Sequence, residues 1–163
     1  MASAGAASIK AWLPPDDILQ RTWPVLSAEL RTYAERTIAA WRDLPADPHG
    51  TIFGFFDGHG WNMAFDHEAQ RLNGVYDFAD SGFGQLHQEF IYSNLIARDL
   101  TGRIVTDYER LTRRSLDRNR IALLTGVHRL WELAEVADTV ASALRFAEAA
   151  PFPDAADVLR DVV

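Results

Sequence analysis

The first part of the chain carries apolar residues at helical spacing, interrupted by prolines. Pro14 and Pro15 are followed by two aspartates, and a proline with carboxylates in a first turn favours a helix, here predicted over residues 16–22. Between Ser27 and about Asp43 the apolar residues recur every three or four positions, which predicts a second amphipathic helix. Residues 44–50 contain two prolines and a glycine and predict a loop.

The middle of the chain has the composition of short strands. Residues 51–56 are β-branched and aromatic and predict a strand that ends at Asp57. A glycine-rich loop follows, and a short apolar strand begins at Asn62. Residues 66–73 are polar and predict a hairpin turn, after which residues 74–78 predict the returning strand.

Beyond Asp80 the apolar spacing becomes helical. The predicted helices are residues 86–97, a segment capped by Thr101, a segment capped by Asp117, residues 137–147 and a short terminal piece over 154–162. With residues 1–10 as a flexible leader, the pattern predicts one domain over residues 11–163. Its class is α+β, mostly α-helical, with the helices around a small β-hairpin sheet.

Three polar residues stand where the predicted strands begin and end. Asp57 precedes the first hairpin strand, Asn62 lies at its start, and Asp77 lies at the end of the second. Asp-x-x-x-x-Asn followed by Asp-Phe is the order in which protein-kinase-like enzymes present a catalytic aspartate and two metal ligands. Phosphoryl transfer needs a carboxylate that orients the attacking hydroxyl, and amide and carboxylate oxygens that hold Mg²⁺.

This segment resembles the C-terminal lobe of the aminoglycoside phosphotransferase and choline kinase family. The family signature is His-Gly-Asp-x-His-x-x-Asn followed by Asp-Phe-Gly, and the resemblance covers residues 15–150. It implies that Asp57 is the catalytic aspartate and that Asn62 and Asp77 are metal ligands. His59 takes the position of the second signature histidine, which implies a supporting role in the loop.

The match to the signature is partial. Gly82–Phe90 resembles the family's Gly-x-Gly-Asp-x-x-x-Asp-Leu segment. The departures are Phe55 and Phe56 for the first His-Gly, Ala79 for the glycine, and Gln85 and Glu89 for two aspartates. Losing the first histidine affects the support of the loop and leaves the metal ligands in place. Trp61, inside the loop, is a candidate wall of a substrate pocket, and Asp80 is open between holding metal and filling a polar loop.

The resemblance implies a fold, a reaction and cofactors. The fold is a protein-kinase-like C-terminal lobe whose hairpin sheet carries the catalytic-type loop. The reaction is transfer of the γ-phosphate of ATP to a hydroxyl of a small molecule with Mg²⁺, so ATP and Mg²⁺ are the expected cofactors. The net charge of −7 is compatible with a cationic substrate, and it disfavours nucleic acid and anionic membranes as partners.

One part of such an enzyme is expected to be absent from this chain. Kinases of this superfamily hold the α- and β-phosphates with a lysine under a Gly-rich loop. The only lysine is Lys10, and residues 1–50 contain no Gly-x-Gly-x-x-Gly. The alternative function is therefore a truncated, non-catalytic remnant that acts as a binding or dimerisation module. Because loss of a lobe exposes apolar surface, we expect a homodimer or a partner that supplies the lobe.

Other chemistries are less well supported by the residues. The chain has no cysteine, which excludes disulfides and cysteine-based sites. His59, His67 and His87 with Asp57 could form a hydrolase metal site, but no His-Glu-x-x-His spacing is present. Ser81 lacks the Gly-x-Ser-x-Gly elbow of a serine nucleophile. No apolar run approaches a membrane span and the start is no convincing signal peptide, so a cytoplasmic location is expected.

Overall fold

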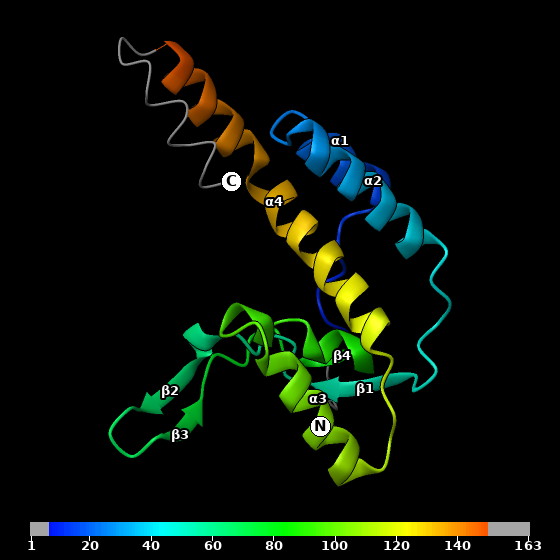
Figure 1. Ribbon diagram of the computed structural model, residues 1–163, viewed down its shortest axis with the longest axis vertical. Helices are drawn as coiled ribbons and strands as arrows, with labels where there is room; N and C mark the ends of the chain where they lie inside the picture. Colours follow the sequence, from blue (N-terminus) through cyan, green and yellow to red (C-terminus); the bar gives the residue numbers. More distant parts are fainter. Residues whose placement is uncertain (1–6, 150–163) are drawn as a thin grey trace, which may run out of the picture. The chain divides into compact units, whose positions relative to one another are not determined.

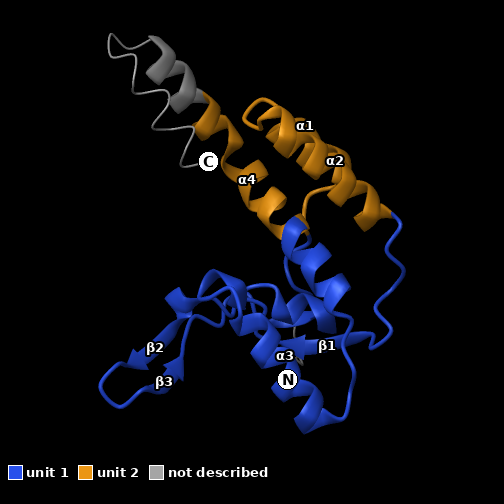
Figure 2. Cartoon of the chain, in the orientation of Figure 1, with its two compact units in different colours: residues 1–11, 43–126 blue, residues 12–42, 127–163 orange. Residues whose placement is uncertain are grey.

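The computed structural model describes residues 7–149, which contain four α-helices, four strands and three 3₁₀ helices (Figure 1). The chain divides into two compact units (Figure 2). One unit comprises residues 1–11 and 43–126, and the other comprises residues 12–42 and 127–163. The content is mixed, helices with small antiparallel sheets, in agreement with the predicted class.

The helical unit is built from α1 (Pro15–Thr22), α2 (Ala28–Arg42) and the later turns of α4 (Arg118–Ala149). α1 begins with proline at its first position and two aspartates in its first turn, as the sequence predicts. Burial of apolar side chains at helical spacing holds the three helices together. The buried residues of this core are Ile18, Leu26, Ala34, Ile38, Leu130 and Ala134.

The second unit contains two separate two-stranded sheets. β1 (Thr51–Gly54) pairs antiparallel with β4 (Gly82–Gln85). β2 (Met63–Asp66) and β3 (Arg71–Val75) form a hairpin of their own. The returning strand β3 therefore starts earlier than the predicted 74–78. The reason is the turn: the Asp66 carboxylate accepts the N–H groups of Glu68 and Ala69 and closes the turn within four residues.

Segments far apart in sequence complete the β1–β4 sheet. The backbone N–H of Ile9 donates to the Phe83 carbonyl at 3.1 Å, and the N–H of Phe83 donates to Ala7 at 3.0 Å. The last residues of the predicted leader that the structure describes thus lie beside β4, whereas residues 1–6 lie outside the described residues. β4 itself falls in a stretch that the sequence pattern assigned to no strand.

The helices after β4 differ from the predicted ones. In place of a single helix over 86–97 there are two short 3₁₀ helices, η2 (Leu86–Phe90) and η3 (Ser93–Leu95). The backbone N–H of His87 donates to a buried carboxylate of Asp47 at 3.0 Å, and such side-chain bonds compete with a regular helix.

α3 (Leu100–Thr112) and α4 follow this segment. Asp99 rather than Thr101 stands at the cap position of α3. Asp117 caps α4 as predicted, because its Oδ1 accepts the N–H groups of Asn119 and Arg120. α4 is one helix where two were predicted, since no glycine or proline interrupts residues 127–149. The predicted helix over 154–162 lies outside the described residues.

The unit that contains the two sheets has a core of its own, formed by residues of η2, α3, the loop after α3 and the start of α4. Its buried residues are Leu86, Phe90, Val105, Leu116 and Ile121. In the described part of the chain, no helix has both the length and the apolar character needed to cross a membrane.

A buried hydrogen bond between Asp47 and His87 joins the loop before β1 to η2 and to the start of α4. Nδ1 of His87 lies 2.7 Å from Oδ2 of Asp47, and both side chains are almost fully buried. Nε2 of His87 accepts the N–H of Asp117 at 3.0 Å, so the imidazole proton is on Nδ1 and is donated to the carboxylate. Burial alone raises the pKa of Asp47, but hydrogen bonds from His87 and from the His49 N–H outweigh it and leave the pKa below its ordinary value of 3.8.

We expect Asp47→Asn to lower the free energy of unfolding at pH 7 by about 2–4 kcal/mol, because it removes the charge of a buried, hydrogen-bonded pair. A depressed pKa contributes stability that is present above pH 3.8 and is lost as the pH falls through the folded-state pKa. Urea unfolding from pH 7 to pH 3 should therefore show the gap between wild type and variant narrowing at the acid end. Asp43→Asn, at an exposed neighbouring position, is the control and should leave stability unchanged. An equal loss of unfolding free energy in Asp47→Asn and Asp43→Asn would contradict a specific stabilising role of the buried Asp47 carboxylate.

Candidate functional site

The loop after β1 holds Asp57 by both oxygens of its carboxylate. Oδ2 accepts a hydrogen bond from Nδ2 of Asn62 at 2.5 Å, and the same Nδ2 lies 3.2 Å from the Asp57 carbonyl. Oδ1 lies 2.9 Å from Nε2 of His59. Asn62 ends η1 (Gly60–Asn62), directly before β2, and is 5% exposed. The structure thus brings the predicted aspartate and asparagine into direct contact, with the predicted histidine as a second support.

The backbone before Asp57 is held by a carboxylate from a distant segment. Phe56 has a φ of 53°, in the left-handed region that non-glycine residues rarely adopt. The N–H groups of Phe55 and Phe56 donate to Oε1 and Oε2 of Glu89, at 3.3 and 3.0 Å. Burial raises the pKa of Glu89 above its ordinary value of 4.5, although these two hydrogen bonds oppose the shift.

Gly54 makes room for this carboxylate. A Cβ at Gly54 would lie 2.4 Å from Oε2 of Glu89 and 2.8 Å from the ring of Phe56. The sequence identified Glu89 only as the replacement of a family aspartate, without a role. The absence of a histidine at position 55 or 56 was the available signal that the loop takes its support from elsewhere.

Asp77 and Asp80 face the same carboxylate from the far end of the hairpin. Asp77 follows β3 by two residues, has a φ of 58° and accepts the N–H of Ala79 at 3.4 Å. The pKa of Asp57 is raised above 3.8, first by burial and then by repulsion from Asp80 and Asp77, while His59 and the Asn62 hydrogen bond lower it. Asp77 and Asp80 therefore both repel the charge of Asp57.

Aromatic side chains surround this acidic group and are largely exposed. Trp61 is 75% exposed and packs edge-on against His59, with ring centroids 5.3 Å apart. The Tyr76 hydroxyl donates to the Trp61 carbonyl. Phe78 is 62% exposed and its ring lies 5.2 Å from that of Phe55. The predicted pocket-wall residue thus projects beside the loop.

The donor set fits a magnesium ion that is also held by phosphate oxygens. Asn62 uses Nδ2 toward Asp57, which leaves its amide oxygen for a cation, and Asp77 adds a carboxylate. Within the described residues no three His, Cys, Asp or Glu side chains gather closely enough to enclose a metal. Mg²⁺ is usually bound by one or two carboxylates together with substrate phosphates and water, so an all-protein cage is not required.

The alternative sites lack the necessary contacts. His87 is buried and bonded to Asp47, and His67 is exposed in the β2–β3 turn, so the three histidines do not meet at Asp57. The hydroxyl of Ser81 is buried and, within residues 7–149, has no hydrogen-bond partner, so no base activates it.

The fold and site define a class in which a loop aspartate, an asparagine five residues on and an aspartate after a hairpin converge. The model of the phosphotransferase enzyme family matches residues 1–124, and this chain belongs to that family. Neither a curated protein nor a solved structure matches the chain.

We expect Gly54→Ala to displace Glu89 from the loop. The added Cβ overlaps both Glu89 and Phe56, so the free energy of unfolding should fall by about 1–3 kcal/mol. Hydrogen exchange of the Phe55 and Phe56 amides, followed by NMR, should accelerate because both lose their acceptor. Gly58→Ala is a matched control, since no heavy atom lies within 4 Å of its Cβ. Unchanged exchange at Phe55 and Phe56 in Gly54→Ala would show that Glu89 does not hold the loop.

Proposed function

We propose that this chain is the catalytic lobe of an ATP-dependent small-molecule phosphotransferase of the kinase-like type. It would transfer the γ-phosphate to a hydroxyl of a small substrate. The observation that carries the proposal is the direct Asp57–Asn62 hydrogen bond of 2.5 Å, with Asp77 and Asp80 acting on the same carboxylate. Such a group supplies a proton acceptor and oxygen ligands, which phosphoryl transfer requires.

Asp57 is the residue that would accept or orient the hydroxyl proton. Asn62 and His59 fix its two oxygens, so the carboxylate keeps one orientation. Its pKa is raised by burial and by its acidic neighbours, which makes it a stronger proton acceptor than an exposed aspartate. The amide oxygen of Asn62 and the carboxylate of Asp77 would hold Mg²⁺. When bound, this ion neutralises charge on the phosphate oxygens.

The nucleotide needs a further surface. The only lysine, Lys10, is exposed, and its neighbour Ile9 hydrogen-bonds to β4, so the lysine is not presented by a strand of a separate lobe. The proposal therefore requires a Gly-rich loop and a phosphate-binding lysine from outside residues 1–163, in cis or from a partner. The exposed aromatic residues of the loop and hairpin are the apolar surface that such a lobe would cover.

A second candidate function is a binding or dimerisation module without catalysis. It is favoured by the exposed aromatic side chains in residues 53–83, of which Phe53 is 58% and Trp61 75% exposed. Soluble monomers rarely expose large apolar patches without an interaction partner.

The first test is thermal unfolding with and without Mg²⁺ and ATP. At a hundredfold excess over Kd a ligand adds about 2.7 kcal/mol, or roughly 5–10 °C in Tm for a chain of this size. We expect a rise that needs both Mg²⁺ and ATP and disappears in Asp77→Asn, because the variant lacks the carboxylate charge. Asp107→Asn, on the exposed face of α3, should retain the rise. Absence of any magnesium-dependent rise at millimolar ATP would show that Asn62 and Asp77 do not hold Mg²⁺ and ATP without the further lobe.

The dimerisation candidate is tested by the molar mass in solution. Multi-angle light scattering at about 10 µM should give a dimer, and Trp61→Gln should shift it toward the monomer by removing apolar area from the patch. Leu111→Gln is the control, since Leu111 is 72% exposed on α3, away from the aromatic residues. A monomeric wild type rules dimerisation out.

A further inference from the structure

A cavity lies among η3, α3 and α4. Its volume is about 370 Å³, and it is formed by the chain after η3 and by the first turns of α3 and α4. Val105 and Ile121 give it an apolar floor and are 1% and 3% exposed. Thr101 and Thr125 add hydroxyl groups to its wall. Small-molecule sites are concave and mostly apolar, with a few polar groups, and this volume lies at the small end of their range.

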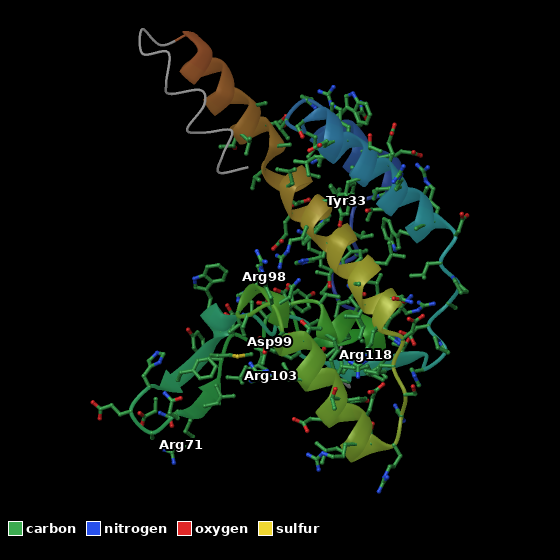
Figure 3. The ribbon with its side chains drawn as sticks, in the orientation of Figure 1. Tyr33, Arg71, Arg98, Asp99, Arg103 and Arg118 are labelled. Atoms are coloured by element: carbon green, nitrogen blue, oxygen red, sulfur yellow. The ribbon has the colours of Figure 1, made fainter. Side chains whose placement is uncertain are left out.

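The charged side chains that line this cavity are positive. Of the described residues that line it, two are arginines, Arg98 and Arg118, and none carries a carboxylate. Figure 3 shows them on different elements, with Arg98 before α3 and Arg118 at the start of α4. In a chain with a net charge of −7, such a local excess of guanidinium groups selects for an anion.

The two arginines differ in their contacts with the rest of the protein. Nη2 of Arg118 donates to Oε2 of Glu109 at 2.9 Å and to Oγ1 of Thr106 at 3.2 Å, so its guanidinium is fixed before a ligand arrives. Arg98 makes no hydrogen bond or ion pair with any residue in the described range 7–149. The adjacent carboxylate of Asp99 is already 3.2 Å from Nε of Arg103. Arg98 is therefore the free cation of this part of the cavity wall.

Gly102 leaves part of the cavity open. It lies in the first turn of α3, where glycine is among the weakest helix formers, and no heavy atom lies within 4 Å of a Cβ built on it. Close packing therefore does not require a glycine there. The space above it belongs to the cavity.

We propose that this cavity binds a small hydroxylated organic anion. Its carboxylate or phosphate group would pair with Arg98 and Arg118, and its carbon chain would lie on Val105 and Ile121. Thr125 donates its hydroxyl proton to the Ile121 carbonyl at 2.8 Å, so its oxygen accepts a hydroxyl of the ligand.

The cavity is connected to the Asp57 loop through η3. A Cβ at Gly60, in the loop, would lie 3.4 Å from the side chain of Ile96, two residues before Arg98. Ser93 of η3 hydrogen-bonds to Thr101 at 2.8 Å. If the proposed function holds, the anion is the acceptor of the phosphoryl group. Only this role as acceptor rests on the proposed function; binding of the anion in the cavity does not.

A matched ligand series tests the proposal without nucleotide. Gluconate and sorbitol 6-phosphate carry the two anionic groups, sorbitol is neutral and glucamine is cationic on the same carbon chain. In ¹⁵N NMR titrations, at least one anion should shift the amides of Thr101, Gly102 and Thr125, while sorbitol and glucamine should not. The anion that binds shows whether the site prefers a carboxylate or a phosphate.

Two variants and one control locate the site. Arg98→Gln should weaken binding about tenfold or more, as expected for loss of one charge-assisted pair. Gly102→Leu fills open space in a helix, so it should fold at least as stably as wild type and abolish binding. Arg110→Gln removes an exposed arginine that pairs with Asp107 and does not line the cavity, so it should leave affinity unchanged.

Three results would overturn the proposal: neither anion shifts these amides, glucamine binds as well as the anions, or Arg98→Gln and Arg110→Gln lose affinity equally. Because ATP and Mg²⁺ are absent from the titration, failure of nucleotide binding leaves its result unchanged. If the anion binds but Mg²⁺ and ATP do not raise the Tm, the anion site stands and only its assignment as the site of the phosphoryl acceptor is rejected.

Discussion

The geometry of the candidate site depends on one partly buried carboxylate. Glu89 accepts the N–H groups of Phe55 and Phe56 on its two oxygens, which holds Phe56 in a left-handed conformation that an aromatic residue rarely adopts. That conformation turns the chain abruptly after β1, so Asp57 leaves the strand and meets Asn62. Gly54 is part of the same arrangement because any side chain there would occupy the position of the Glu89 carboxylate. A partly buried carboxylate on backbone N–H groups thus supports the chain where the family signature places a histidine.

The second constraint is electrostatic. Asp57 is desolvated and faces Asp77 and Asp80, and only His59 and the Asn62 amide oppose the resulting rise in its pKa. These carboxylates come from the loop and from the end of the hairpin, two segments without a shared hydrogen-bond ladder in the described residues. A divalent cation between them would relieve the repulsion and also fix the hairpin end against the loop. The same ion would then serve chemistry and local order, which gives a physical reason for one ligand, Asn62, on the loop and one, Asp77, at the end of the hairpin.

The sequence predicted correctly those features that depend on interactions between residues close together in the chain. Pro15 with two acidic residues, the Asp117 cap and the Asp57–Asn62 spacing act over a few residues, and the structure contains the corresponding helix starts and contact. The secondary-structure prediction was wrong where a contact with a residue distant in sequence determines the local structure. Residues 86–97 are not one helix because Asp47, forty residues away, takes the His87 N–H. The pairing of β4 with β1 and with Ala7 and Ile9 has no signature within β4 itself, and neither has the reach of Glu89 across 33 residues to Phe56.

The two charged regions of this unit have opposite signs, and this opposition constrains any ligand that contacts both. An anionic group is repelled by Asp57, Asp77 and Asp80 and attracted by Arg98 and Arg118, so the molecule has one favourable orientation. Its anionic end lies at the arginines, and its neutral hydroxyl is the part that the carboxylates tolerate. A cationic molecule would adopt the reverse orientation and place its charge, rather than a hydroxyl, at Asp57. Ser93 of η3 hydrogen-bonds to Thr101 on the cavity wall, and Ile96, directly after η3, lies next to Gly60 of the loop, so this short segment adjoins both regions. In the proposed arrangement, charge separation across one short 3₁₀ helix would present a hydroxyl, and not the charged group, to the catalytic-type aspartate.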